Sequence, residues 1–77
     1  MSINVKFFAR LREDLGREGC SLAADNVTTA IDAWHIATEG KAIPPGTLIA
    51  VNMEYAAQDQ PVKDGDEVAF FPPVTGG

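Results

Sequence analysis

The sequence is poor in the residues from which disulfide-rich and membrane proteins are built. Its single cysteine, Cys20, cannot form an internal disulfide, which excludes a small scaffold held together by such bonds. No apolar run approaches the roughly 20 residues of a membrane-spanning helix. The first residues, MSINVKFFARLRED, also lack a secretory apolar core followed by a cleavage site. We therefore expect a cytoplasmic protein with no membrane partner.

Positive charge is scarce as well. Six Lys and Arg residues stand against eleven Asp and Glu residues, and the net charge is -5. Proteins that bind nucleic acid neutralise phosphates with clustered basic residues, so this balance argues against a nucleic-acid partner. An acidic surface suits a basic patch on a partner protein, because opposite charges speed association, although solubility alone also explains it.

The side chains contain no arrangement that predicts a catalytic or metal site. His35 is the only histidine, and no serine or cysteine motif accompanies it, so we expect a surface or boundary residue. Cys20 has no neighbour that would lower its pKa, which predicts an inert, partly buried thiol. The run DGDE at residues 64–67 lacks the ligand spacing of a calcium loop, and a turn with Gly65 at positive φ explains it. We expect no metal and no permanently bound cofactor.

The length of 77 residues allows one small domain. Such a chain buries roughly 60% of the surface that it would expose when unfolded, which leaves no room for a deep cleft between domains. Hydrophobic residues make up 45% and charged residues 22%, as in ordinary globular proteins. These bounds favour a binding module, carrier or subunit over a self-sufficient enzyme.

Alternating apolar and polar residues predict the first strand over residues 3–7. Its apolar residues share one face, and Phe8 then points to the opposite face. Apolar runs between turn residues predict a weaker strand, a buried strand, a short strand and a last strand, at residues 20–23, 48–52, 55–57 and 67–71.

One amphipathic helix is predicted between Val27 and Gly40. At about 100° per residue, its apolar positions form a single stripe, which consists of Ala30, Ile31, Trp34 and Ala37. Asp25 and Asn26 supply helix-start chemistry, and Thr28 or Thr29 can cap the first turn. Ile36 falls opposite the stripe and is expected to be exposed.

The order strand, strand, helix, strand, short strand, strand predicts an α+β fold. We expect a mixed sheet of four to five strands covered on one face by one main helix. The only other helical segment expected is a turn at residues 10–14, which Gly16 stops. This is the layout of a β-grasp domain. A ferredoxin-like fold would need a second helix, and nothing after residue 40 supplies one.

The chain finishes on FFPPVTGG, which predicts a domain over residues 1–71 and an extended, flexible tail over residues 72–77. The two prolines cannot donate hydrogen bonds to a sheet, and they stiffen the base of the tail. At about 3.3 Å per residue, the tail would reach about 20 Å. Its two glycines could enter a narrow channel and leave the carboxylate unobstructed. Either another enzyme activates this carboxylate, or the tail is simply frayed.

These residues resemble the small, sulfur-carrying subunit of molybdopterin synthase, a ubiquitin-like β-grasp family. The resemblance covers nearly the whole chain and rests on VKFFARLRE, LIAVN and especially DGDEVAFFPPVTGG. A terminal Gly-Gly alone is shared with ubiquitin-like modifiers and with the thiamine-pathway sulfur carrier. The longer run is much more specific to the molybdopterin synthase subunit.

The resemblance implies a carrier mechanism. A ubiquitin-activating-like adenylyltransferase would use ATP to adenylate the Gly77 carboxylate, and a sulfur donor would convert it to a thiocarboxylate. The tail would then insert into the large synthase subunit, through Pro73, Val74, Thr75, Gly76 and Gly77. There the sulfur would pass to cyclic pyranopterin monophosphate and form the molybdopterin dithiolene. The family implies a heterotetramer with two copies of each subunit, in which this chain acts as part of a sulfurtransferase.

The resemblance also implies a docking surface, made of Phe8, Arg12, Tyr55 and Phe71. Phe8 and Phe71 each add a second aromatic residue to a strand, which would place them on the face away from the helix. The alternative is that both belong to the core. Two other functions stay open, a modifier conjugated to lysines through Gly77 and a sulfur carrier for thiamine synthesis.

Overall fold

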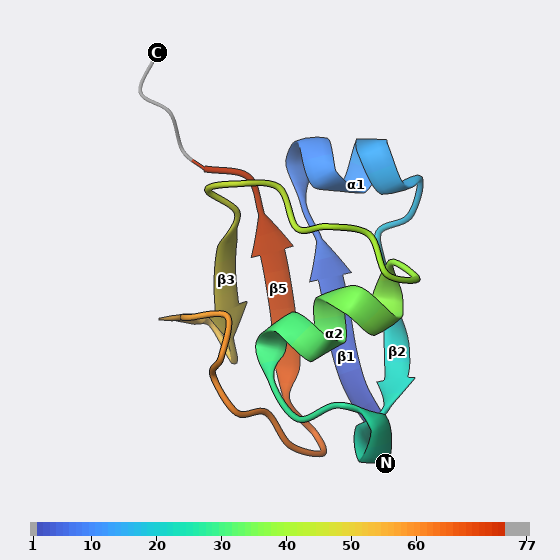
Figure 1. The fold of residues 1–77 in the computed structure, drawn as a ribbon, viewed down its shortest axis with the longest axis vertical. Helices are drawn as coiled ribbons and strands as arrows, with labels where there is room; N and C mark the ends of the chain where they lie inside the picture. Colours follow the sequence, from blue (N-terminus) through green and yellow to red (C-terminus); the bar gives the residue numbers. More distant parts are fainter. Residues whose placement is uncertain (1, 74–77) are drawn as a thin grey trace.

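Two segments from opposite ends of the sequence, β1 (Ser2–Phe7) and β5 (Glu67–Phe71), lie side by side and run parallel at the centre of the fold (Figure 1). The computed structural model describes residues 2–73. The five-stranded sheet has the order β2-β1-β5-β3-β4, and all its other pairings are antiparallel. Its remaining strands are β2 (Gly19–Ala23), β3 (Leu48–Val51) and β4 (Glu54–Ala56). This is the mixed sheet that the sequence predicted.

The core lies between one face of the sheet and the helix α2 (Ala30–Ala37), which crosses that face (Figure 1). Trp34 packs edge-on against Phe7 and Phe70, with ring centroids 5.7 and 5.1 Å away. The Trp34 indole nitrogen donates to the Lys41 carbonyl at 2.9 Å, so its polar atom is satisfied. The predicted inward face of the first strand is confirmed, since Ile3, Val5 and Phe7 are all buried.

The start of α2 differs from the prediction. Val27 is buried but extended, and the residues expected to start the helix form a separate 3₁₀ turn, Ala24–Asn26. Thr29 is the cap: its side chain accepts from the Asp32 amide, and the Asp32 carboxylate accepts from the Thr29 amide at 3.1 Å. The sequence identified the cap among its candidates but placed the first turn too early.

The first backbone amides of α2 have no acceptor within the helix, and they donate to carbonyls of a loop that is distant in sequence. Ala30 donates to the Gln60 carbonyl and Ile31 to the Gln58 carbonyl, each at 2.9 Å. Because only tertiary contact brings this loop to the helix, the boundary was not readable from local sequence. The helix also ends early, at Ala37, although Gly40 adopts the expected positive φ of 91°.

The helix that covers the sheet is α2, as predicted, but the turn expected at residues 10–14 is longer than the sequence indicated. A second helix, α1 (Ala9–Leu15), has 7 residues against 8 in α2 and lies beyond the end of β1 (Figure 1). It ends at Gly16, with φ 72°, as predicted for the shorter turn. Leu11 is its only buried residue among those described. One buried residue produces no visible apolar stripe, so the sequence revealed only a single turn.

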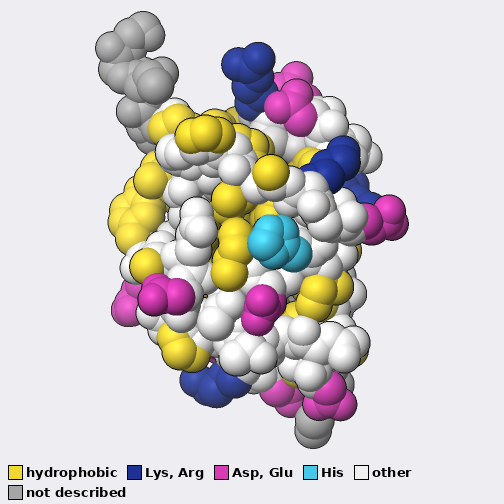
Figure 2. Space-filling model, viewed as in Figure 1, with side chains coloured by type: hydrophobic (Ala, Val, Ile, Leu, Met, Phe, Trp, Pro, Cys, Tyr) yellow, Lys and Arg dark blue, Asp and Glu magenta, His cyan; other side chains and the backbone are white. Residues whose placement is uncertain are grey.

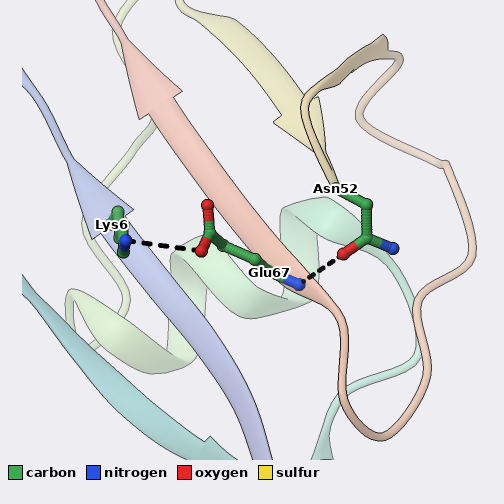
Figure 3. Close-up of polar contacts among 3 residues, drawn as sticks. All are labelled: Lys6, Asn52 and Glu67. Atoms are coloured by element: carbon green, nitrogen blue, oxygen red, sulfur yellow. Dashed lines mark hydrogen bonds and ion pairs between the residues drawn. The ribbon is translucent and has the colours of Figure 1, made fainter.

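A polar network joins the β3–β4 hairpin to the start of β5 (Figure 3). The Asn52 side-chain oxygen accepts from the Glu67 backbone amide at 3.0 Å. The Asn52 backbone amide donates to the Glu67 backbone carbonyl at 2.8 Å. Lys6 forms an ion pair with the Glu67 carboxylate at 3.3 Å across the β1–β5 pair. These contacts hold the hairpin against the central strands.

Asp66 completes this network from a buried position. Its carboxylate accepts from the Asn52 side-chain amide and from the Lys63 backbone amide, both at 2.9 Å. Gly65 adopts φ 89°, which confirms the predicted turn at residues 64–67. The Asn52 hydrogen bond, then the Lys63 amide and the Lys63 charge, lower the pKa of Asp66 against the opposing effect of burial.

Asp66 should therefore make stability depend on pH. Because its folded pKa lies below the ordinary 3.8, the stabilisation is complete above 3.8 and disappears as pH falls through the folded pKa. We expect Asp66→Asn to lower the free energy of unfolding at neutral pH. The difference in this free energy between the variant and the native chain, called the gap below, should narrow in acid. Urea unfolding at several pH values measures this gap. A gap that stays constant into strong acid would contradict the role of the Asp66 charge.

The β3–β4 turn holds two non-glycine residues at positive φ, Asn52 at 52° and Met53 at 71°. Met53 is 92% exposed, so its side chain contributes little packing. We expect Met53→Gly to raise the free energy of unfolding by about 0.5–1 kcal/mol, because glycine removes the left-handed strain at a smaller entropic cost. Met53→Ala keeps that strain and serves as the control. Equal unfolding midpoints for the two variants would exclude strain as the cause.

Candidate functional site

The face of the sheet opposite α2 carries an uncovered apolar area. Strand pairing places Leu48 beside Phe71, and Ala50 between Ala69 and Tyr55. Phe8 directly follows Phe7, the last residue of β1, and Phe7 pairs with Phe70, which precedes Phe71. We call these residues the outer apolar patch, which consists of Phe8, Leu48, Ala50, Tyr55, Ala69 and Phe71. No helix within residues 2–73 covers this patch (Figure 1).

The aromatic members of the patch are accessible. Tyr55 is 76% exposed and Phe8 44% exposed, while Phe71 is half-buried. The ring centroids of Tyr55 and Phe71 are 5.9 Å apart, so two of the predicted docking residues pack together across β3. The alternative that Phe8 and Phe71 belong to the core is wrong. Their predicted role in docking stays a prediction.

Local backbone geometry explains why Phe8 leaves the core. Phe8 is extended, with φ -122° and ψ 156°, and therefore points opposite to the buried Phe7. Its amide donates to the Phe70 carbonyl at 3.1 Å, which holds it beside the end of β5. Phe8 is also the residue that precedes α1, and its ring stays partly exposed there.

Arg12 lies one helical turn after Phe8, and the two residues line the same surface groove as Lys6 and Cys20. The Arg12 guanidinium is 3.9 Å from the Glu18 carboxylate. This ion pair is exposed and long, so it contributes little to stability and leaves Arg12 available to a partner. The structure thus places Phe8, Phe71 and Tyr55 on the outer face of the sheet, with Arg12 in a groove beside Phe8.

The patch extends to the end of the sheet at which β5 finishes, because Phe71 is the last residue of that strand. β5 ends at Phe71, and Pro72 and Pro73 follow it without strand structure, as predicted. The remaining residues assigned to tail insertion and reaction, Val74, Thr75, Gly76 and Gly77, lie outside the described residues. Their roles stay predictions.

The remaining candidate residues from the sequence, His35 and Cys20, belong to a helix and a strand of the domain. His35 is exposed on α2, and Cys20 is a half-buried free thiol on β2. In residues 2–73 no group of three His, Cys, Asp or Glu side chains is placed to hold a metal ion. None of the helices described there is long and apolar enough to cross a membrane.

Sequence reasoning missed three patch residues, Leu48, Ala50 and Ala69. The run LIAV of β3 is apolar at every position, so alternation could not show which residues face outward. Pairing with β5 decides this, because Ile49 lies beside the buried Phe70 while Leu48 lies beside Phe71. The patch is thus larger than the four residues that the resemblance implied.

Comparison with known proteins gives a consistent set of relatives. A family model described as the ThiS family matches residues 5–77. The molybdopterin synthase sulfur carrier subunit of Escherichia coli K12 is 45% identical over 80 residues, covering 97% of this chain and 99% of that protein.

Solved structures support the same fold. SAMP1 from Haloferax volcanii, a small archaeal modifier protein, matches with a TM-score of 0.77 and 30% identity, covering 100% of both chains. A chain from the complex of subunits 1 and 2 of the molybdopterin-converting factor of Helicobacter pylori matches with a TM-score of 0.67 and 26% identity, again covering 100% of both chains. These neighbours confirm the predicted ubiquitin-like β-grasp fold.

Proposed function

Because the chain belongs to the ThiS family, we propose that it is the sulfur-carrier subunit of a molybdopterin synthase. The observation that carries this proposal is the match, along 97% of the chain, to a curated relative of that name. The family match also extends through the residues of the proposed tail. The outer apolar patch supports the proposal, since a subunit of this kind needs a docking face near the tail that it delivers.

The proposed chemistry takes place at the Gly77 carboxylate. A ubiquitin-activating-like adenylyltransferase transfers AMP from ATP to this carboxylate and releases pyrophosphate. The resulting acyl-adenylate is a reactive electrophile, whereas a free carboxylate is a poor one. A sulfur donor then displaces AMP and leaves a thiocarboxylate on Gly77. In the large subunit each thiocarboxylate passes one sulfur atom to cyclic pyranopterin monophosphate, and water supplies the oxygen that restores the carboxylate. Two such transfers build the molybdopterin dithiolene, and each spent carrier returns for another cycle.

In this proposal the described residues bind and position partners. The outer apolar patch docks on the large subunit, and Pro72 and Pro73 carry the tail away from the sheet. The Helicobacter pylori complex of subunits 1 and 2 supports a large-subunit partner, and we propose two copies of each subunit. Catalytic side chains then come from the partners, so the carrier needs no active site of its own.

The proposal is tested by incubating the chain with an activating enzyme, ATP and a sulfur donor, followed by intact mass measurement. We expect the mass change of one oxygen-to-sulfur exchange, located on Gly77. The charged carrier, mixed with the large subunit and cyclic pyranopterin monophosphate, should yield molybdopterin. A charged carrier that yields no molybdopterin would refute the synthase role, and an unchanged mass would refute the thiocarboxylate itself.

A second candidate is a protein modifier, which the similarity to the archaeal SAMP1 favours. Its distinguishing product is a set of higher-mass adducts joined to lysines by isopeptide bonds through Gly77. A thiamine-pathway carrier would show the same oxygen-to-sulfur exchange without supporting molybdopterin formation. The mass and product measurements therefore separate all three functions.

A further inference from the structure

The turn at residues 44–47 is a rigid structure next to the end of β5. The Thr47 amide and hydroxyl both bond to the Pro44 carbonyl, at 3.2 and 2.7 Å. Pro45 and Gly46 occupy its central positions, and Gly46 has φ 81°. This combination is typical of a type II turn, in which proline restricts one φ and glycine supplies the positive φ of the next residue. The turn therefore has little conformational freedom.

This turn touches the last residue that the structure describes. A Cβ atom added to Gly46 would lie 3.4 Å from Cγ and 3.6 Å from Cβ of Pro73. The bare α-carbon of Gly46 thus faces the proline ring, and an added methyl group would be in van der Waals contact with that ring. Figure 2 shows hydrophobic side chains gathered where the loop after α2 passes the end of the sheet. Two proline-stiffened segments meet there, since Pro72 precedes the contact on one side and Pro45 on the other.

The contact is specific to Gly46. Three other glycines with positive φ, Gly16, Gly40 and Gly65, would have nothing within 4 Å of an added Cβ. The positive φ alone explains why glycine stands at those three positions. One groove is lined by Pro72 and Pro73, by Pro44 and Thr47 of the turn, and by residues of α1, which are Arg10, Leu11 and Asp14. The base of the tail therefore borders a groove that it shares with the turn and with α1.

We propose that the 44–47 turn is a seat that sets the direction in which the chain leaves the domain at Pro73, and that Gly46 is a positioning residue for sulfur transfer. This inference rests on the proposed carrier function. Pro73 has no amide hydrogen to donate, so packing takes the place of a donated backbone hydrogen bond in orienting this residue. A fixed base lowers the ordering cost when the tail enters its partner, and it aligns the reacting end.

The main experiment compares Gly46→Ala with Gly40→Ala. Both glycines have similar positive φ, 81° and 91°, so both variants carry the same kind of backbone strain, but only Gly46→Ala adds a methyl group against Pro73. With charged carrier and saturating large subunit, we expect Gly46→Ala to slow single-turnover sulfur transfer about tenfold. Gly40→Ala should stay within about twofold of the native rate. Equal rates for the two variants would overturn the proposal.

Pro73→Ala tests the same contact from the other side. We expect it to slow transfer by a similar factor while leaving the unfolding midpoint nearly unchanged, because Pro73 is exposed. In the Pro73→Ala background, Gly46→Ala should cause little further slowing, because the two residues act through one contact. Independent, additive effects would contradict that shared contact. The large subunit is kept saturating in all these measurements, so a slower rate reports the transfer step and not a loss of binding.

A measurement without any partner separates this inference from the carrier function. Spin labels are placed at Thr75→Cys and Glu13→Cys, with Cys20→Ser removing the native thiol. We expect Gly46→Ala to shift or broaden the distance distribution between the labels, and Gly40→Ala to leave it unchanged. If the distance distributions of Gly46→Ala and Gly40→Ala differ as expected but the native chain forms no thiocarboxylate, the proposed carrier function is refuted. The proposed role of the 44–47 turn is then still supported. An unaltered distribution in Gly46→Ala would refute the seat even for a carrier that works.

Discussion

Deleting Gly77 is expected to abolish charging with sulfur and leave the fold intact. The shortened chain ends on Gly76, so its carboxylate stops about 3.3–3.6 Å short of the position at which the activating enzyme would adenylate Gly77. A misplacement of about 1 Å can cost about a hundredfold in rate, so we expect at least this loss. The fold should survive because the last strand already ends at Phe71. Intact mass after incubation with activating enzyme, ATP and sulfur donor measures the loss.

A tag appended after Gly77 is the complementary change. It keeps both glycines but moves the terminal carboxylate to another residue, so charging should again disappear. Proteolytic removal of the tag back to Gly77 should restore charging, which shows that the tagged chain was folded. Sulfur acceptance by a tagged chain that cannot be processed would contradict the proposed chemistry at the Gly77 carboxylate.

Replacing Tyr55 or Phe71 by Ser is expected to weaken binding to the large subunit by about thirtyfold or more. These aromatic residues pack together in the outer apolar patch, with ring centroids 5.9 Å apart. Aromatic anchors at interface centres typically contribute at least about 2 kcal/mol. Serine leaves the net charge of the chain unchanged, so long-range steering is preserved. Titration calorimetry with the large subunit measures the dissociation constant.

Ile36→Ser provides the matched control for the docking prediction. Ile36 is 41% exposed, close to the 44% of Phe8, but it lies on α2 at the opposite face of the sheet. Its predicted exposure is confirmed, and we expect its replacement to leave binding nearly unchanged. Equal losses for Ile36→Ser and Tyr55→Ser would show that general surface hydrophobicity, rather than the outer apolar patch, drives association.

The inward faces of β1 and β5 were predictable because alternation is a local property. Residues of one strand that share a face are two positions apart, whatever the strand later pairs with. Phe70 and Phe71 illustrate this, since one is buried and the other lies in the outer apolar patch. The helical boundaries failed where the decisive partner was distant. The first backbone amides of α2 donate to the carbonyls of Gln58 and Gln60. No sequence pattern around residue 30 predicts that this loop lies beside the start of the helix.

The sequence by itself determined the absence of an internal disulfide, the outward direction of the second aromatic residue in two Phe-Phe pairs, and the run DGDEVAFFPPVTGG, from which the carrier hypothesis came. These are properties of composition, local periodicity and motif. Only the tertiary structure decided which residues share a surface. Strand order brings Tyr55 to Phe71, and the path of the loop after α2 brings Gly46 to Pro73. Such contacts depend on which strands pair and which backbone angles a turn adopts, so they arise only when the whole chain has folded.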